Sequence, residues 1–181
     1  MPSDETHDEQ LLKRAAGGNE EAFTELYRCR QGEIYRFALQ MTGSRHVAEE
    51  VVQDVFLTVV RSMNSFDAAR GSVRAWLYGV ARNCVLRHAD RNPQTVPLAE
   101  MPGPEPVDLD RAESIESVRR AVVALPQPFR EAVVLCDLQE LSYAEAAAVM
   151  GVPVGTVRSR LSRGRALLGD ALKSGISRCF A

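Results

Sequence analysis

The stretch that most constrains the fold lies near the C-terminal end of the chain, LSYAEAAAVMGVPVGTVRSRLSRGRALL at 141–168. Ser142 followed three residues later by Glu145 is a capping box, in which each side chain accepts a hydrogen bond from the other residue's backbone N–H. Gly151 suits the left-handed conformation that ends a helix, and Pro153 suits the first turn of a following helix. The stretch therefore predicts a helix, a tight turn and a second helix.

The second of these helices has a buried side and a polar side. Its predicted buried positions are Val157, Leu161, either Arg165 or Ala166, and Leu168. Its polar stripe, at steps of three and four residues, carries Arg158, Ser159, Ser162 and Arg163, with Thr156 near the helix start. Arginines and short hydroxyls in this pattern suit the base edges and phosphates of a DNA major groove. The pattern favours a helix-turn-helix over its alternative, a surface hairpin with a solvated basic face.

The bulk composition is that of an ordinary globular protein. The 181 residues are 45% hydrophobic and 25% charged, enough for one large or two small domains. No apolar run approaches the roughly 18 to 20 residues that a membrane helix needs, and the N-terminal MPSDETHDEQ is acidic where a secretory signal is basic and then apolar. We expect a cytoplasmic protein without membrane insertion.

The residues that commonly bind metals are scattered along the chain. The four cysteines are Cys29, Cys84, Cys136 and Cys179, and the three histidines are His7, His46 and His88. None of them has the paired spacing of a zinc site or of a disulfide framework. The sequence therefore predicts no metal and no cofactor.

Charge is distributed unevenly, although the net charge is only −2. Residues 154–178 carry six basic residues against one acidic residue, and residues 70–91 carry five against one. Residues 100–117 carry six acidic residues against one basic residue. Two basic patches thus flank an acidic connector, and basic patches of this kind suit nucleic acid.

Four helices are predicted in the N-terminal half. The first covers Glu9–Ala16, and Asn19 caps a second that runs to about Thr42. Ser44 caps a third helix and Ser72 a fourth. Valines at every fourth position of the third helix form its buried stripe, while its other side carries Glu49, Glu50, Gln53, Asp54 and Leu57. From the residues alone, that acidic side favours an ordinary solvated surface.

An aromatic loop precedes the fourth helix. Residues 64–72, NSFDAARGS, contain Asn64 and Phe66, and the helix that follows has Arg74, Asn83 and Arg87 on its polar side. Exposed bases stack on aromatic rings while arginines follow the phosphates, so this pairing suits single-stranded DNA. Trp76 lies on the apolar side with Val73, Leu77, Val80 and Cys84 and favours a place in the core.

A proline-rich acidic linker separates the two halves. Residues 93–110 show neither a helical nor a strand period, and helix resumes at about Arg111. Pro126 and Pro128 interrupt it, and Pro128 opens another helix that leads into the helix-turn-helix. We therefore predict an all-α protein of two small helical domains, 8–92 and 111–175.

Three segments in order resemble the extracytoplasmic-function (ECF) sigma factors, the smallest members of the sigma-70 family of bacterial transcription initiation factors. AEEVVQDVFL at 48–57 is similar to their polymerase-binding segment, and VRAWLYGVARN at 73–83 to their promoter-melting and minus-10 segment. The stretch at 141–168 is similar to their minus-35 reader. The resemblance covers nearly the whole chain.

The resemblance implies roles for individual residues. Glu50, Gln53, Asp54 and Leu57 fall where the family docks on the clamp of core RNA polymerase, and Asn64, Phe66, Arg74, Trp76, Asn83 and Arg87 fall in or beside the segment that captures single-stranded minus-10 DNA. Thr156, Arg158, Ser159, Ser162 and Arg163 fall on the minus-35 reading surface. Ser162 stands where many members have a bulky residue, so no base preference is carried over there. The acidic linker suits the basic polymerase channels that family linkers enter.

The implied function is a non-enzymatic specificity subunit that binds core polymerase and promoter DNA and is held inactive by an anti-sigma factor. One alternative is a stand-alone helix-turn-helix regulator that acts without polymerase. A recombinase-like enzyme using Glu49, Glu50 or Asp54 as metal ligands is disfavoured, because adjacent carboxylates diverge on a helix and no third ligand is evident.

Overall fold

The structure, a computed structural model, describes residues 4–91 and 109–179, and all its regular elements in these ranges are helical. The helices are α1 (Asp4–Ala16), α2 (Glu20–Thr42), α3 (Arg45–Ser62), α4 (Val73–Arg91), α5 (Leu109–Ala124), α6 (Gln127–Val133), α7 (Tyr143–Met150) and α8 (Val154–Cys179), with 3-10 turns at Met63–Ser65 and Ala68–Arg70 and a π-helical segment at Val134–Leu138. The all-α prediction is confirmed. The predicted linker lies almost entirely outside the described residues.

Three predicted helix starts of the N-terminal half are confirmed, whereas the first helix begins at Asp4 instead of Glu9. The side chain of Asn19 accepts a 2.8 Å hydrogen bond from the N–H of Ala22, and the Ser44 hydroxyl accepts one of 3.4 Å from Val47. The Ser72 hydroxyl accepts one of 3.1 Å from Ala75. These local side-chain acceptors satisfy N–H groups that have no partner inside the helix, so short-range sequence is sufficient to fix the starts.

The helix-turn-helix is built as its sequence predicts, with one difference at Pro153. The capping box joins Ser142 and Glu145 in both directions, and Gly151 ends α7 at φ 65°. Pro153 lies before α8, where its carbonyl accepts from the N–H groups of Thr156 and Val157. It therefore occupies the capping position instead of the first turn, because its own fixed φ suits either place.

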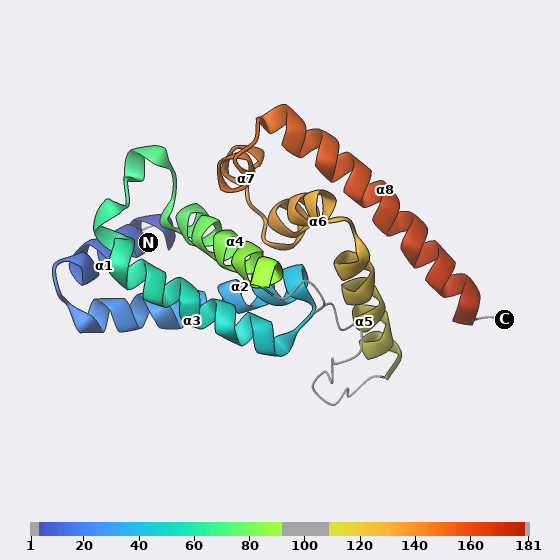
Figure 1. Ribbon diagram of the computed structural model, residues 1–181, viewed down its shortest axis with the longest axis horizontal. Helices are drawn as coiled ribbons and strands as arrows, with labels where there is room; N and C mark the ends of the chain where they lie inside the picture. The colour runs from blue at the N-terminus through green and yellow to red at the C-terminus, as the bar shows by residue number, and fades with distance from the viewer. Residues whose placement is uncertain (1–3, 92–108, 180–181) are drawn as a thin grey trace.

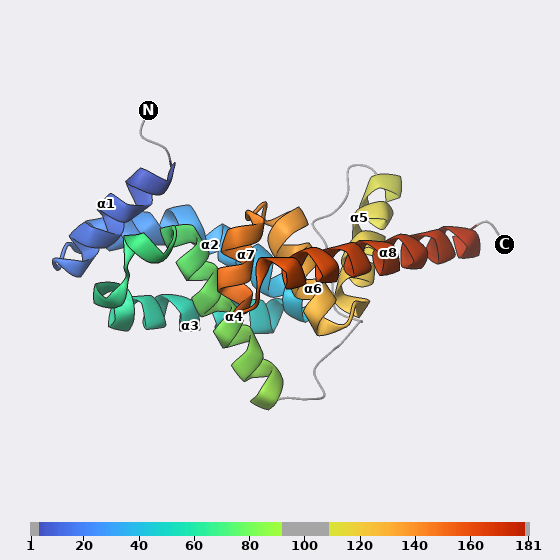
Figure 2. The same ribbon diagram turned by 90° about the horizontal axis from the view of Figure 1, so that it is seen from above.

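The N-terminal helices α1 to α4 pack together, and α5 to α8 pack together beside them (Figure 1). Figure 2 shows the C-terminal end of α8 extending beyond the other helices. The two groups also contact each other, through α4 with α7 and through α2 with α5 and Val134–Leu138. At one such contact, a β-carbon added to Gly43 would lie 3.1 Å from Val123. The two predicted domains are therefore in direct contact.

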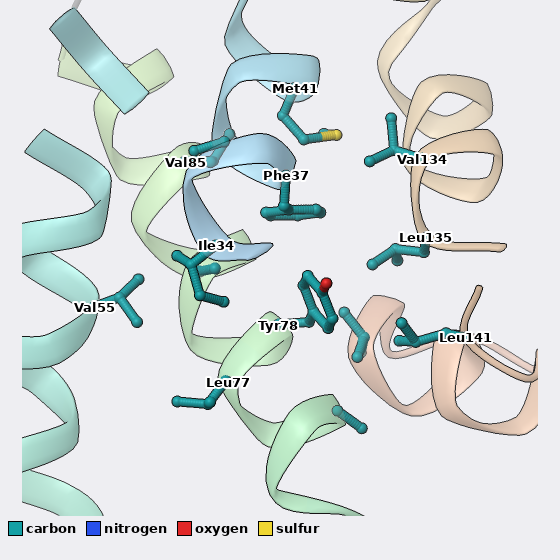
Figure 3. Packing of buried hydrophobic residues seen from close by; sticks show 14 of the residues in the cluster. Ile34, Phe37, Met41, Val55, Leu77, Tyr78, Val85, Val134, Leu135 and Leu141 are labelled. Atoms are coloured by element: carbon teal, nitrogen blue, oxygen red, sulfur yellow. The ribbon is translucent and has the colours of Figure 1, made fainter. Parts of the chain in front are cut away.

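One hydrophobic core runs through both groups (Figure 3). Tyr78 of α4 is fully buried and packs edge-on against Phe37 of α2, with ring centroids 5.4 Å apart. Leu135 and Leu141 reach the same region from the C-terminal half. Tyr78 was not predicted to be a core residue. A buried hydroxyl group needs a hydrogen-bond partner, and the sequence does not reveal that partner.

Two predictions of burial need correction. Arg165 and Ala166 are both exposed, and the buried position on that side of α8 is Gly164. A β-carbon there would lie 2.8 Å from Val133 Cγ2 and 3.1 Å from the carbonyl oxygen of Phe129, so α8 approaches α6 too closely for a side chain. Trp76 is half-buried instead of lying inside the core.

Candidate nucleic-acid interface

The polar stripe of α8 lies on the outer surface of the C-terminal half. Arg158, Ser159, Ser162 and Arg163 are exposed, and Thr156 is half-buried. Val157 and Leu161 on the other side are buried where α8 packs on α6 and α7. The first turns of α8 therefore present two guanidinium groups and the Ser162 hydroxyl as donors that suit base edges and phosphates, while the Ser159 hydroxyl donates to the Thr156 carbonyl at 3.0 Å.

Two arginines of α8 have partners that the sequence did not predict. The Arg158 guanidinium lies 5.7 Å from the ring centroid of Tyr143, the first residue of α7. Arg165 Nε donates a 3.0 Å hydrogen bond to Asp137. Hydrogen bonding with Asp137 raises the pKa of Arg165, whose side chain is committed to this pair. Arg158 and Arg163 thus remain the arginines that face solvent on the reading stripe, and Tyr143 orients one of them.

The aromatic loop forms a pocket with α1. Phe66 lies against Trp76, with ring centroids 5.5 Å apart and planes tilted by 58°. Asn64 and Phe66 line a pocket of about 310 Å³ whose other wall is α1. The structure therefore brings Asn64, Phe66 and Trp76 into one neighbourhood.

Asn83 and Arg87 line a different pocket. It has a volume of about 430 Å³ and lies between α3 and α4, with Thr58, Val80, Leu86 and Asp90 as its other lining residues. The Arg87 guanidinium also donates to the sulfur of Cys84 at 3.0 Å, while burial raises the pKa of that thiol. Asn83 and Arg87 therefore lie apart from Asn64 and Phe66 on the N-terminal half.

Arg74 is half-buried and is held by hydrogen bonds within the protein. Its Nε donates to Glu33 at 3.1 Å, and another of its nitrogens donates to the carbonyl of Gln139 at 2.7 Å. Burial acts to lower the pKa of Arg74, but the hydrogen bonds and charge interactions with Glu33 and Tyr78 together outweigh it and raise the pKa overall. The charge is therefore retained, and the side chain joins α4 to the C-terminal half in this arrangement.

Further polar contacts cross the same boundary. The Tyr78 hydroxyl donates to the Gln139 side chain at 2.8 Å, and Gln139 donates to Gln40 at 2.8 Å. Burial raises the pKa of Tyr78 to about 12, so it stays protonated and able to donate. Arg82 pairs with the buried Glu131 at 3.2 Å. Such long-range partners have no signature in a single sequence.

The acidic side of α3 combines carboxylates with exposed apolar side chains. The Asp54 carboxylate lies 3.0 Å from Nε2 of His88 in α4, and the Glu50 carboxylate lies 3.7 Å from Nδ1 of the same ring. Gln53 is exposed, and Leu57 and Val60 remain 55% and 48% exposed. Exposed leucine and valine next to carboxylates suit a protein partner better than bulk water. The sequence did not indicate that Val60 is exposed, because Val60 continues the apolar row of Ala48, Val52 and Phe56 at four-residue steps.

Neither a metal site nor a membrane-spanning helix is found within residues 4–91 and 109–179. No group of three or more histidine, cysteine, aspartate or glutamate side chains is arranged there to bind a metal ion. None of the helices in those ranges combines the length and the apolar character needed to cross a bilayer.

Comparison with known proteins gives matches in both halves. The model of Sigma-70 region 2 matches residues 26–93, and that of Sigma-70 region 4 matches residues 115–168. The chain is 38% identical over 172 residues to the ECF RNA polymerase sigma factor SigC of Mycobacterium tuberculosis, covering 89% of each protein. It is 36% identical to SigE of Mycolicibacterium smegmatis over 162 residues, which are 83% of this chain and 62% of SigE.

Two solved structures resemble the whole arrangement. One is CnrH in complex with the cytosolic domain of CnrY, at a TM-score of 0.73 and 27% identity over 93% of this chain and 98% of that one. The other is the sigma factor RpoE of Bartonella quintana in complex with the anti-sigma factor NepR. Its TM-score is 0.68 and its sequence identity 27%, over 83% of this chain and 96% of that one.

Proposed function

This chain belongs to the sigma-70 family, in its ECF group of RNA polymerase sigma factors, and we propose that its surfaces divide the recognition of a promoter between them. It binds core RNA polymerase and directs it to specific promoters. It acts in the cytoplasm as an initiation factor without a catalytic reaction of its own. The observation that carries the assignment is the match of both regions, in order, along one chain.

Each surface has a role supported by its chemistry. The half-buried carboxylates of Glu50 and Asp54, with the exposed Gln53 and Leu57, form the surface of α3 that binds core polymerase. The stripe from Arg158 to Arg163 on α8 reads the minus-35 duplex. Asn64 and Phe66 bind single-stranded minus-10 DNA, and Asn83 and Arg87 contact the same strand farther along. Residues 8–92 and 111–175 are the two domains that carry these roles.

Reading both elements requires the domains to separate. Elements near −10 and −35 are about 25 base pairs apart, which is about 85 Å of B-form DNA. In this structure the two domains are in direct contact, which we call the closed arrangement. Ser72 at the start of α4 is there hydrogen-bonded to Glu145 at the start of α7. A compact chain of 181 residues has a radius of gyration of about 16 Å, well short of that separation. Core polymerase therefore holds the domains apart and releases Arg74 from Gln139.

The relatives indicate a second protein partner. Both structural neighbours were solved as complexes, one of them with a protein named as an anti-sigma factor. An anti-sigma factor that binds the closed arrangement keeps the two domains together and the chain inactive. This partner is expected to compete with core polymerase.

Transcription with purified core polymerase tests the assignment. Core enzyme mixed with this chain gives run-off transcripts from a genomic library, whereas either component alone gives none. The stand-alone regulator predicts the opposite, a stable complex of the chain with operator DNA in the absence of polymerase. Failure of the chain to associate with bacterial core polymerase would overturn the assignment.

A further inference from the structure

Helix α1 closes one side of the pocket that contains Asn64 and Phe66. The α1 residues that line it are Glu9, Leu12, Lys13 and Ala16, and they face Met63, Asn64, Phe66 and Ala68. Its volume of about 310 Å³ lies at the lower end of the roughly 300 to 1,000 Å³ found for small-molecule pockets. A space of this size suits a single flat ring system. The matched family region begins at residue 26, after α1 has ended.

Buried contacts fix the position of α1. Leu11, Leu12 and Ala15 lie in the core, and the carboxylate of Asp8, only 1% exposed, pairs with Arg30 of α2 at 2.7 Å. Arg30 in turn pairs with Glu33. Breaking a buried ion pair leaves an uncompensated charge, so α1 is held in one register against α2. Glu9 and Lys13, one turn apart, therefore have defined places on the pocket wall.

The two charged side chains of that wall have free bonding capacity. Within the described part of the chain, neither Glu9 nor Lys13 has a side-chain hydrogen bond or ion pair. A carboxylate only accepts hydrogen bonds, and an unstacked cytosine, adenine or guanine each offers it an exocyclic amino N–H, whereas thymine does not. An ammonium group binds phosphate. The apolar ring of Phe66 offers a surface on which a base can stack.

We propose that α1 completes the single-strand DNA site, so that the pocket takes one unstacked base bearing an exocyclic amino group. Glu9 accepts a hydrogen bond from that amino group, Asn64 contacts another edge of the base, and Lys13 binds a neighbouring phosphate. This inference rests on the proposed function, and it assigns base selectivity to a helix outside the matched family region.

The experiment uses holoenzyme assembled from core polymerase and full-length variants. Run-off transcription is measured on promoters carrying each of the four bases at every non-template position of the downstream element. Glu9→Gln replaces one carboxylate oxygen by an amide N–H donor, which can bond thymine O4, so we expect the preference for the amino-bearing bases over thymine at one position to fall about tenfold. Lys13→Ala is expected to weaken binding for all bases and to reduce the slope of log affinity against log salt concentration by about 0.7 to 1.

Arg14→Ala is the matched control, because Arg14 is exposed on the same helix and does not line the pocket. Holoenzyme containing the Arg14→Ala variant should show the same base preference as holoenzyme containing the unaltered chain. If Glu9→Gln keeps that preference, or if Lys13→Ala behaves like Arg14→Ala, the inference is wrong while the sigma-factor assignment stands. Absence of transcription with the unaltered chain contradicts the assignment itself, so the two failures are distinguishable.

Discussion

The hydroxyl of Ser72 donates a 2.9 Å hydrogen bond to the carboxylate of Glu145 and thereby joins the start of α4 to the start of α7. The same carboxylate accepts the backbone N–H of Ser142 in the capping box. One side chain therefore contributes both to a local helix start and to the contact between the two domains.

Glu145→Gln should reduce stability in a pH-dependent way. Partial burial acts to raise the pKa of Glu145, but hydrogen bonds from Ser142 and Ser72 and the charge of Arg74 lower it overall. A lowered folded-state pKa contributes stability that is fully present above the ordinary glutamate pKa of 4.5 and is lost as pH falls below it through the folded-state pKa. In urea titrations, the variant should be less stable than the unaltered chain at pH 7, and the difference should shrink below about pH 4.5. A constant difference would show that the carboxylate is not ionised in these bonds.

Charge reversal at the ion pair between Arg82 and Glu131 should open the closed arrangement. Glu131 is 2% exposed, and breaking a buried pair costs about 3 to 5 kcal/mol. Arg82→Glu alone should increase the radius of gyration measured by small-angle scattering, and combining it with Glu131→Arg should restore much of the compactness. If the double variant is no more compact than the single one, the pair does not hold the domains together.

The close contact of α8 with α6 makes Gly164 intolerant of a side chain. Gly164→Ala places a methyl group against Val133 and should lower the free energy of unfolding by about 1 to 3 kcal/mol. Gly169→Ala is the control in the same helix, since nothing lies within 4 Å of its added carbon. That variant should gain up to about 1 kcal/mol from helix propensity. Denaturant titration of both variants measures the contrast.

Arg163→Ala should weaken minus-35 binding by about 1 to 3 kcal/mol and relax base preference at one position. Arg163 is exposed on the reading stripe, whereas Arg165 is engaged by Asp137. Arg165→Ala therefore serves as a comparison that also removes one positive charge. Holoenzyme binding to promoter variants measures both, and equal effects on base preference would remove Arg163 from the reading surface.

Leu57→Ala and Asp54→Ala should weaken association with core polymerase. Leu57 is 55% exposed, so its truncation removes apolar contact area without opening a cavity in the folded chain. Asp54 also loses its contact with His88, which should have little effect on stability because both groups are partly solvated. Glu21→Ala, an exposed carboxylate of α2, is the control. Titration with labelled core enzyme measures the affinities, and normal assembly of both variants would return this side of α3 to an ordinary solvated surface.

Local sequence was sufficient for most of the helical framework. Asn19, Ser44, Ser72 and Ser142 start helices because their side chains reach N–H groups only three residues away. Gly151 ends α7 because it adopts the left-handed conformation without steric cost. The polar stripe of α8 follows from helical periodicity and needed no tertiary information.

Only the tertiary structure decided which of the candidate residues are available. Arg74 is hydrogen-bonded to Glu33 and Gln139. Phe66 and Arg87 line different pockets, and Glu9 and Lys13 of α1 line the same pocket as Asn64. These relationships join residues tens of positions apart, and their energies depend on burial and on the distance between charges. A single sequence fixes its own helices because their hydrogen bonds are local, whereas packing determines which side chains meet between them.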